Sequence, residues 1–206
     1  MGKIKYISLS VLILCCFYPN TSSAQNGWGF IWNFGYSQFI PFNDFSRYMR
    51  GGAGMEVEMG IIYRKFEFCA FTSPHSVKAQ KEFTSNNHPI AVNDKLEGGM
   101  AGFYVSYAVV YKDYLKASPL VGVGWSGFSK KDTPEKNLFT GTVGLQIKST
   151  FVTSLGGLTG GLCVPLYLKY NYCFPRKYSN EINSGMHFIS IGLGLYIKDD
   201  DKKVVF

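Results

Sequence analysis

The stretch HFISIGLGLYIKDD, residues 187–200, decides the fold of this chain. Its large aliphatic residues recur at every second position, and the positions between them hold small residues such as Ser190, Gly192 and Gly194. Successive side chains of a strand point to opposite faces, so one face is bulky and the other nearly bare. A half-buried soluble sheet pairs an apolar face with a polar one. The stretch therefore predicts a strand whose bare face lies in a crowded space.

The composition favours an all-β chain. Aromatic residues make up 17% of the 206 residues, and 23 residues are glycine. Aromatic side chains suit strands, and glycines suit tight turns and close backbone contacts. The apolar content excludes a disordered chain, and the length suits one domain.

The first residues, MGKIKYISLSVLILCCFYPNTSSAQ, have the pattern of an export signal. Lys3 and Lys5 precede an apolar run over residues 7–17, and small residues follow up to Ala24. We expect residues 1–24 to be a signal peptide cleaved between Ala24 and Gln25. A membrane helix is the alternative, but the run falls short of the roughly 20 residues that a span requires.

Lipidation is a second alternative for this segment, because Cys15 and Cys16 lie in the apolar run. A lipidated cysteine follows a small residue, whereas Leu14 precedes Cys15. Beyond the signal, Cys69, Cys163 and Cys173 are too few for a disulfide framework and lack metal-site spacing. They are predicted to be small buried residues, and no cofactor or metal is expected.

The charge of the exported part is modest. Without Lys3 and Lys5 it has 19 basic and 14 acidic residues and no basic block. Nucleic acid is therefore not expected as a partner.

Eight segments alternate with a period of two and are predicted as strands. They cover residues 27–39, 53–63, 65–73, 99–111, 117–128, 139–151, 161–173 and 187–200. The connections between them are alternately long and short. This pattern predicts an eight-stranded antiparallel up-and-down transmembrane β-barrel over residues 25–206, with short periplasmic turns and longer outer loops.

The barrel assigns each face of the strands. Eight strands enclose a bore that side chains can fill, so bulky residues face lipid and small ones face inward. The alternation also places five charged residues inside. They are Glu56, Glu58 and Glu67 on two neighbouring strands, and Lys148 and Lys169 on another two. We expect them to form an ion network across the bore.

Aromatic residues lie near both ends of the strands and predict interfacial girdles, as in outer-membrane barrels. The periplasmic set is Trp28, Tyr63, Phe66, Tyr111 and Phe151, and the outer set is Phe39, Trp125, Phe139, Tyr170 and Tyr172. Ordinary core aromatics are the alternative interpretation.

On these features the chain resembles the small eight-stranded outer-membrane barrels, which include the OmpA transmembrane domain, OmpX and the PorT-like barrels. The resemblance rests on strand pattern, loop alternation and signal, with no sequence motif, and it implies an outer-membrane location in a Gram-negative cell. Such chains often end on an aromatic residue of the last strand. Here Phe206 is separated from that strand by KDDDKKVV.

A non-enzymatic barrel, serving as an anchor, adhesion or assembly component through its outer loops, fits this pattern best. A narrow pore, a lipid-modifying enzyme and a soluble lipocalin-like barrel are the alternatives. His187 and Ser190 are three residues apart on one strand and so face opposite ways, which disfavours a nucleophile–base pair. Outer-membrane lipid, lipopolysaccharide and an unnamed envelope protein are the expected partners. Candidate phosphate contacts are Arg47, Arg50, Lys78, Lys81, Lys130, Lys131, Arg176 and Lys177.

Overall fold

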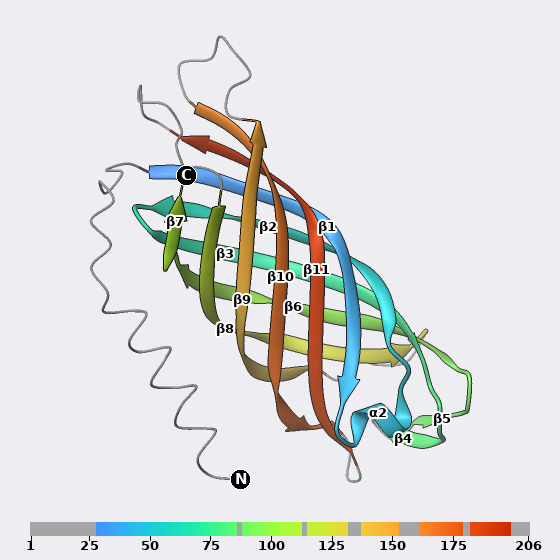
Figure 1. Ribbon diagram of the computed structural model, residues 1–206. Helices are drawn as coiled ribbons and strands as arrows, with labels where there is room; N and C mark the ends of the chain where they lie inside the picture. Colours follow the sequence, from blue (N-terminus) through green and yellow to red (C-terminus); the bar gives the residue numbers. More distant parts are fainter. Residues whose placement is uncertain are drawn as a thin grey trace.

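The computed structural model describes residues 28–85, 88–112, 115–131, 137–152, 161–178 and 182–198. The predicted signal peptide, its cleavage site and the tail with Phe206 lie outside the described residues. Eight long strands make up most of the described chain (Figure 1). They are β1 (Trp28–Phe42), β2 (Gly52–Tyr63), β3 (Phe66–Lys78), β6 (Lys95–Tyr107), β8 (Leu115–Lys130), β9 (Leu138–Val152), β10 (Gly161–Lys177) and β11 (Asn183–Lys198).

These strands close into a barrel. Each long strand pairs antiparallel with the next long one along the chain, and β1 pairs with β11 from Gly29 to Phe42. The predicted eight-stranded antiparallel up-and-down barrel is therefore confirmed. Closure leaves none of the long strands with an unpaired edge, so the backbone groups of the wall are satisfied within the barrel.

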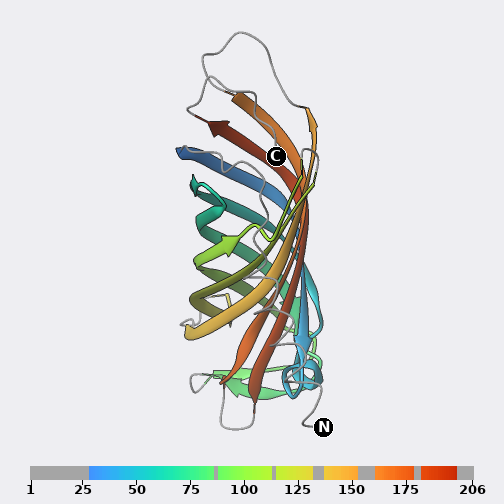
Figure 2. The ribbon, with the colours of Figure 1, turned by 60° about the vertical axis from the view of Figure 1, so that its left-hand side comes forward.

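The two ends of the barrel differ (Figures 1 and 2). The turn end carries Arg64 and Lys65 between β2 and β3, the end of β6 at Tyr107, and the ends of β9 and β10 at Val152 and Gly161. The loop end carries the helix α2 (Phe45–Tyr48) and the hairpin of β4 (Phe83–Ser85) and β5 (His88–Ile90). Among the described residues, no helix is long and apolar enough to cross a membrane.

The strands extend further toward the loop end than the sequence predicted. β3 runs to Lys78 instead of residue 73, and β6 begins at Lys95 instead of residue 99. The outward positions of these extensions include Ser76, Lys78 and Glu97, so a search for apolar alternation stops short of them. The predicted fourth strand also ends early, at Tyr107, and β7 (Val110–Lys112) instead folds back onto β8.

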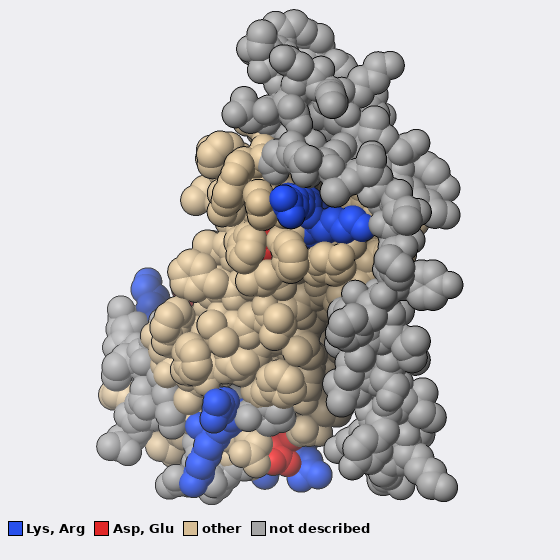
Figure 3. Space-filling view, turned by 90° about the vertical axis from the view of Figure 1, so that its left-hand side faces the viewer, with Lys and Arg blue, Asp and Glu red and all other residues tan. Residues whose placement is uncertain are grey.

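Bulky apolar side chains cover the outside of the barrel. Phe30 is 65% exposed, and Phe103 and Leu193 are each 57% exposed. Figure 3 shows one face, on which the centre is free of basic side chains and these lie around it, toward the two ends and at one margin. Soluble monomers rarely expose continuous apolar surface on this scale.

Glycines on the inner face make room for large neighbours. A Cβ on Gly35 would lie 2.4 Å from the Tyr167 hydroxyl oxygen, and one on Gly192 would lie 2.1 Å from the carbonyl oxygen of Phe34. Both distances are far inside van der Waals contact. The bare face of residues 187–200 is therefore the face that turns into a filled bore.

Candidate functional site: a bore closed by charge and by aromatic packing

The bore near the turn end holds one carboxylate between two ammonium groups. Glu67 on β3 accepts hydrogen bonds from Lys116 Nζ at 2.6 Å and from Lys148 Nζ at 2.9 Å. The Tyr196 hydroxyl donates to the same carboxylate at 3.1 Å. All three charged side chains are at most 3% exposed. We call Glu67, Lys116 and Lys148 the lower ion layer, where lower means nearer the turn end and upper means nearer the loop end.

The middle of the bore holds the opposite ratio, two carboxylates around one ammonium group. Lys169 Nζ on β10 lies 2.8 Å from Glu56 Oε1 and also donates to Glu58 on β2. Glu58 accepts two further hydrogen bonds, from Asn33 Nδ2 at 2.6 Å and from the Tyr104 hydroxyl at 3.0 Å. We call Glu56, Glu58 and Lys169 the upper ion layer.

The two layers are electrically balanced together but not separately. Three buried carboxylates face three buried ammonium groups among the described residues, and each layer alone carries one excess charge. An unpaired charge in a low-dielectric interior is costly, so the layers compensate each other across the bore.

All five charged residues that the sequence placed inside the barrel lie buried there and are paired. Glu67 pairs with Lys148, and Glu56 and Glu58 share Lys169, so the predicted single network is two layers. Sequence reasoning missed Lys116, because it lies in KDYLK, which was taken as a connection. Extending the alternation of Ser118 and Leu120 backwards by one step would have placed Lys116 inside.

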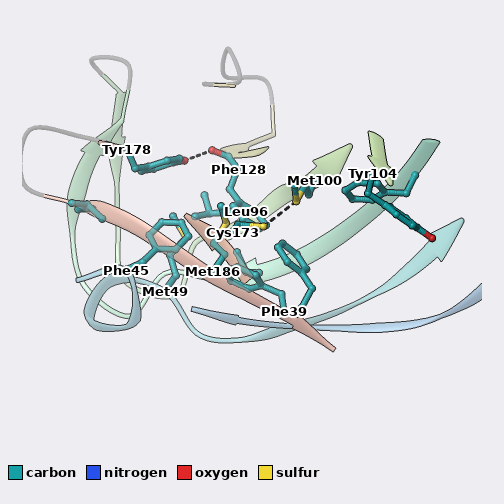
Figure 4. Packing of buried hydrophobic residues seen from close by; sticks show 14 of the residues in the cluster. Phe39, Phe45, Met49, Leu96, Met100, Tyr104, Phe128, Cys173, Tyr178 and Met186 are labelled. Carbon is teal, nitrogen blue, oxygen red and sulfur yellow. Dashed lines mark hydrogen bonds between the residues drawn. The ribbon is translucent and has the colours of Figure 1, made fainter. Parts of the chain in front are cut away.

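The loop end of the bore is closed by aromatic and sulfur-containing side chains (Figure 4). Phe39 is the centre, with ring centroids 5.0 Å from Phe128, 5.5 Å from Phe188 and 6.0 Å from Phe45 of α2. The Tyr178 hydroxyl donates to the carbonyl of Phe128 and ties the connection before β11 to this cluster. We call Phe39, Phe45, Phe128, Tyr178 and Phe188 the aromatic plug.

The plug corrects two sequence-based placements. Phe39 was expected in the outer aromatic girdle, yet its side chain is fully buried. It lies an even number of residues from Ile31 and Ser37, and so on the same inner face of β1. His75 follows the predicted strand 65–73 and was therefore outside it, yet it lies in β3, with its ring centroid 5.2 Å from that of Phe188. The three cysteines Cys69, Cys163 and Cys173 are buried, as predicted, and Cys173 Sγ lies 3.1 Å from Met100 Sδ.

The residues predicted for the aromatic girdle can be placed in the structure, and their role at a membrane interface stays a prediction. Trp28 stacks near Tyr63 at the turn end with centroids 4.6 Å apart, and Phe66 lies beside them on β3. Trp125 and Phe139 pair at 5.6 Å toward the loop end. Tyr170, toward the loop end, has its hydroxyl 2.6 Å from His187 Nδ1. Tyr111, at the turn end, has its ring centroid 5.9 Å from Lys116 Nζ. Tyr111 is directly opposite Lys116 in the strand register and so lies on the inner face, not in the girdle that the sequence predicted for it. The side chain of Phe151 lies outside the described part.

Several basic side chains of the loop end are exposed and lie beside acidic or aromatic groups. Lys130 Nζ lies 2.9 Å from Asp94 Oδ2, and this hydrogen bond lowers the pKa of Asp94. Lys81 Nζ lies 5.2 Å from the Tyr48 ring centroid. Across the described residues, no three His, Cys, Asp or Glu side chains are grouped to hold a metal ion.

Comparisons of the chain with known proteins give likeness in structure alone. No protein-family model and no curated protein matches it. Ail, the attachment invasion locus protein of Yersinia pestis, solved with the heparin analogue sucrose octasulfate, is 12% identical, with a TM-score of 0.48 over 84% of this chain and 99% of Ail. Neisserial surface protein A is 11% identical, with a TM-score of 0.47 over 84% of this chain and 97% of that one.

OprG of Pseudomonas aeruginosa is 9% identical, with a TM-score of 0.45 over 85% of this chain and 97% of OprG. These scores carry no argument about what the present chain does. Its own strand number, order and closure are those of the small eight-stranded barrels, whereas the OmpA, OmpX and PorT-like labels stay predictions.

Proposed function

We propose that the protein is a non-enzymatic β-barrel of the Gram-negative outer membrane that presents its loop end to the outside. The observation that carries this proposal is the pairing of an apolar outer wall with a bore that is closed by charge. Hydrocarbon accepts the exposed side chains of the wall, and closure satisfies the backbone. An anchor, adhesion or assembly component needs this kind of rigid, sealed support.

A narrow pore is the runner-up, and the bore argues against it. Two ion layers and the aromatic plug lie in series along the bore, and Lys169, Glu58 and Phe39 are each fully buried. Purified protein in planar bilayers should give no conductance steps. Steps of constant size would overturn the assignment in favour of a channel.

An enzyme is less well supported. Ser190 points into the bore and is fully buried, whereas His187 lies on the outer face against Tyr170. A nucleophile and its base must lie within hydrogen-bond reach. Comparing the lipids of cells with and without the gene tests this alternative, and we expect identical lipid profiles.

Location is tested by membrane fractionation combined with a gel-shift assay. The unheated protein should sediment with the outer membrane and migrate faster than the boiled form, since a closed barrel resists detergent unfolding. Recovery as a folded, water-soluble protein without detergent would contradict the proposal and favour the lipocalin-like alternative. Contacts with lipopolysaccharide or an envelope protein through the loop end are part of the proposal.

A further inference from the structure

The outer wall formed by β3, β6 and β8 is hollowed in two places. One hollow of about 610 Å³ is apolar and lies between Ala70, Phe103 and Val123. A second of about 320 Å³ lies closer to the loop end, between Thr72, Ala101 and Trp125. Thr72, Ala101 and Trp125 are each the next outward residue toward the loop end after Ala70, Phe103 and Val123 on the same strands. The two hollows therefore follow one another along β3, β6 and β8. We call them together the wall groove.

The backbone itself keeps the upper part of the wall groove open. Gly99 has a φ of 146°, and a Cβ there would lie 2.1 Å from the carbonyl oxygen of Ser73. Its partner across the strands is Pro74, which has no long side chain to lay over it. Only glycine fits this conformation, so no larger side chain at residue 99 can close the hollow.

The opposite wall has larger side chains at the corresponding outward positions. There the neighbouring outward positions are Tyr36 on β1, Ile191 on β11, Leu168 on β10 and Ile147 on β9. On the side of the groove, Ala101 is flanked in the strand register by Thr72 of β3 and Trp125 of β8. Among these described positions, Ala101 and Thr72 are therefore smaller than the residues on the opposite wall, which leaves room for the upper hollow.

Two lysines stand above the groove, between it and the loop end. Lys78 on β3 and Lys95 on β6 are exposed and directly opposite each other in the strand register. Lys95 Nζ also lies 2.8 Å from Glu97 Oε1, and both side chains of this pair are 62% exposed. An exposed ion pair contributes little to stability, so a phosphate can compete with Glu97 for the two lysines, whose like charges repel at directly opposite positions. They lie four residues beyond Pro74 and Gly99, about 13 Å at the usual rise of a strand.

We propose that the wall groove binds one lipid A molecule, an acylated glucosamine disaccharide with phosphate groups, from the outer leaflet. An acyl chain lies along the apolar hollow, the sugar lies beside Trp125 and Asn137, and a phosphate lies between Lys78 and Lys95. The outward positions from Phe68 to Pro74 span about 20 Å along the strand, or about 14 Å along the membrane normal at the usual tilt of ~45°, which matches one leaflet, about half of the ~30 Å hydrocarbon core. This inference rests on the proposed outer-membrane location and orientation.

Trp125 makes the proposal measurable. Replacing the other two of the three tryptophans, Trp28→Phe and Trp32→Phe, leaves Trp125 as the only indole. Purified, folded barrel in detergent is titrated with lipid A, with phosphatidylglycerol and with phosphatidylethanolamine. Fluorescence of Trp125 should change saturably with lipid A alone, and native mass spectrometry should show one bound molecule.

Two variants and one control decide the site. Ala101→Leu, which fills the upper hollow, and the pair Lys78→Gln and Lys95→Gln should each raise the lipid A midpoint at least tenfold. Ala53→Leu makes the same substitution at an exposed position of β2 that lines neither hollow, and it should leave the midpoint unchanged.

The opposite results are equally clear. A response that never saturates, or an unchanged midpoint in Ala101→Leu, would mean ordinary solvation by lipid and overturn the site. Equal binding of phosphatidylglycerol would overturn the glycolipid as its ligand. The titration uses only protein that shows the heat-dependent gel shift and outer-membrane fractionation, so failure here leaves the proposed function standing.

Discussion

The two ion layers and the aromatic plug close the same bore by different physics. The ion layers fill it with groups that must be paired, so each member matters for the charge of the others. The plug fills it with rings that contact one another without directional demands. The comparison teaches that the barrel is closed twice. Removing a partner in the ion layers should lower the free energy of unfolding by leaving a buried charge unpaired, whereas shortening a side chain of the plug should lower it through lost packing.

The largest effect is expected for Lys169→Met. This change leaves Glu56 and Glu58 buried without their shared ammonium group, and removing one partner of a buried pair costs about 3–5 kcal/mol. Urea unfolding in lipid vesicles, followed by the gel shift, measures the loss. An unchanged unfolding midpoint would mean that the upper ion layer is hydrated and contributes no pairing.

Lys148→Met is the matched control for this variant. Glu67 keeps Lys116 at 2.6 Å, so the carboxylate remains paired and the loss should be clearly smaller than for Lys169→Met. Raising the salt concentration should leave the difference between the two variants in place, because buried pairs are screened little. Equal losses would contradict the division into two layers.

Phe39→Ala tests the plug and should cost less, about 3 kcal/mol, the lower end of the usual range for a buried Phe. The short helix α2, which carries Phe45 against Phe39, can settle into the space. The variant should still show no conductance in planar bilayers, since both ion layers remain. New conductance steps would show that the plug alone seals the barrel.

The smallest effect is expected at the surface pair of Asp94 and Lys130. The hydrogen bond from Lys130 lowers the pKa of Asp94, so any stability it gives is present above the unfolded pKa and is lost as the pH falls through the folded value. Because the pair is exposed, Asp94→Asn should not measurably change the unfolding midpoint at pH 7 or pH 4. A clear loss at pH 7 that disappears at pH 4 would show that the loop end is held by surface charge.

The wall of the barrel was predictable from the sequence, and much of the bore was not. Alternation in a strand has an unambiguous period, so it identified the closed barrel and placed Glu56, Glu67 and Lys169 inside. The plug was missed for two reasons. Phe39 was assigned to the girdle from its place near a strand end, although the alternation puts it on the inner face of β1. His75 lies where β3 passes beyond the apolar belt and the outward residues turn polar. The wall groove was missed as well, since it depends on which strands are neighbours and on the conformation of Gly99.

The central claim is that the bulky face of the strands lies in hydrocarbon. Spin labels on single cysteines at residues 189, 191 and 193 of β11 and 143, 145 and 147 of β9, in lipid bilayers, test it most directly. Every label should be accessible to oxygen and protected from a water-soluble nickel complex, with the strongest protection at the middle of each strand. Immobile labels that neither reagent reaches, or labels open to the nickel complex, would mean that these side chains face a protein core or water.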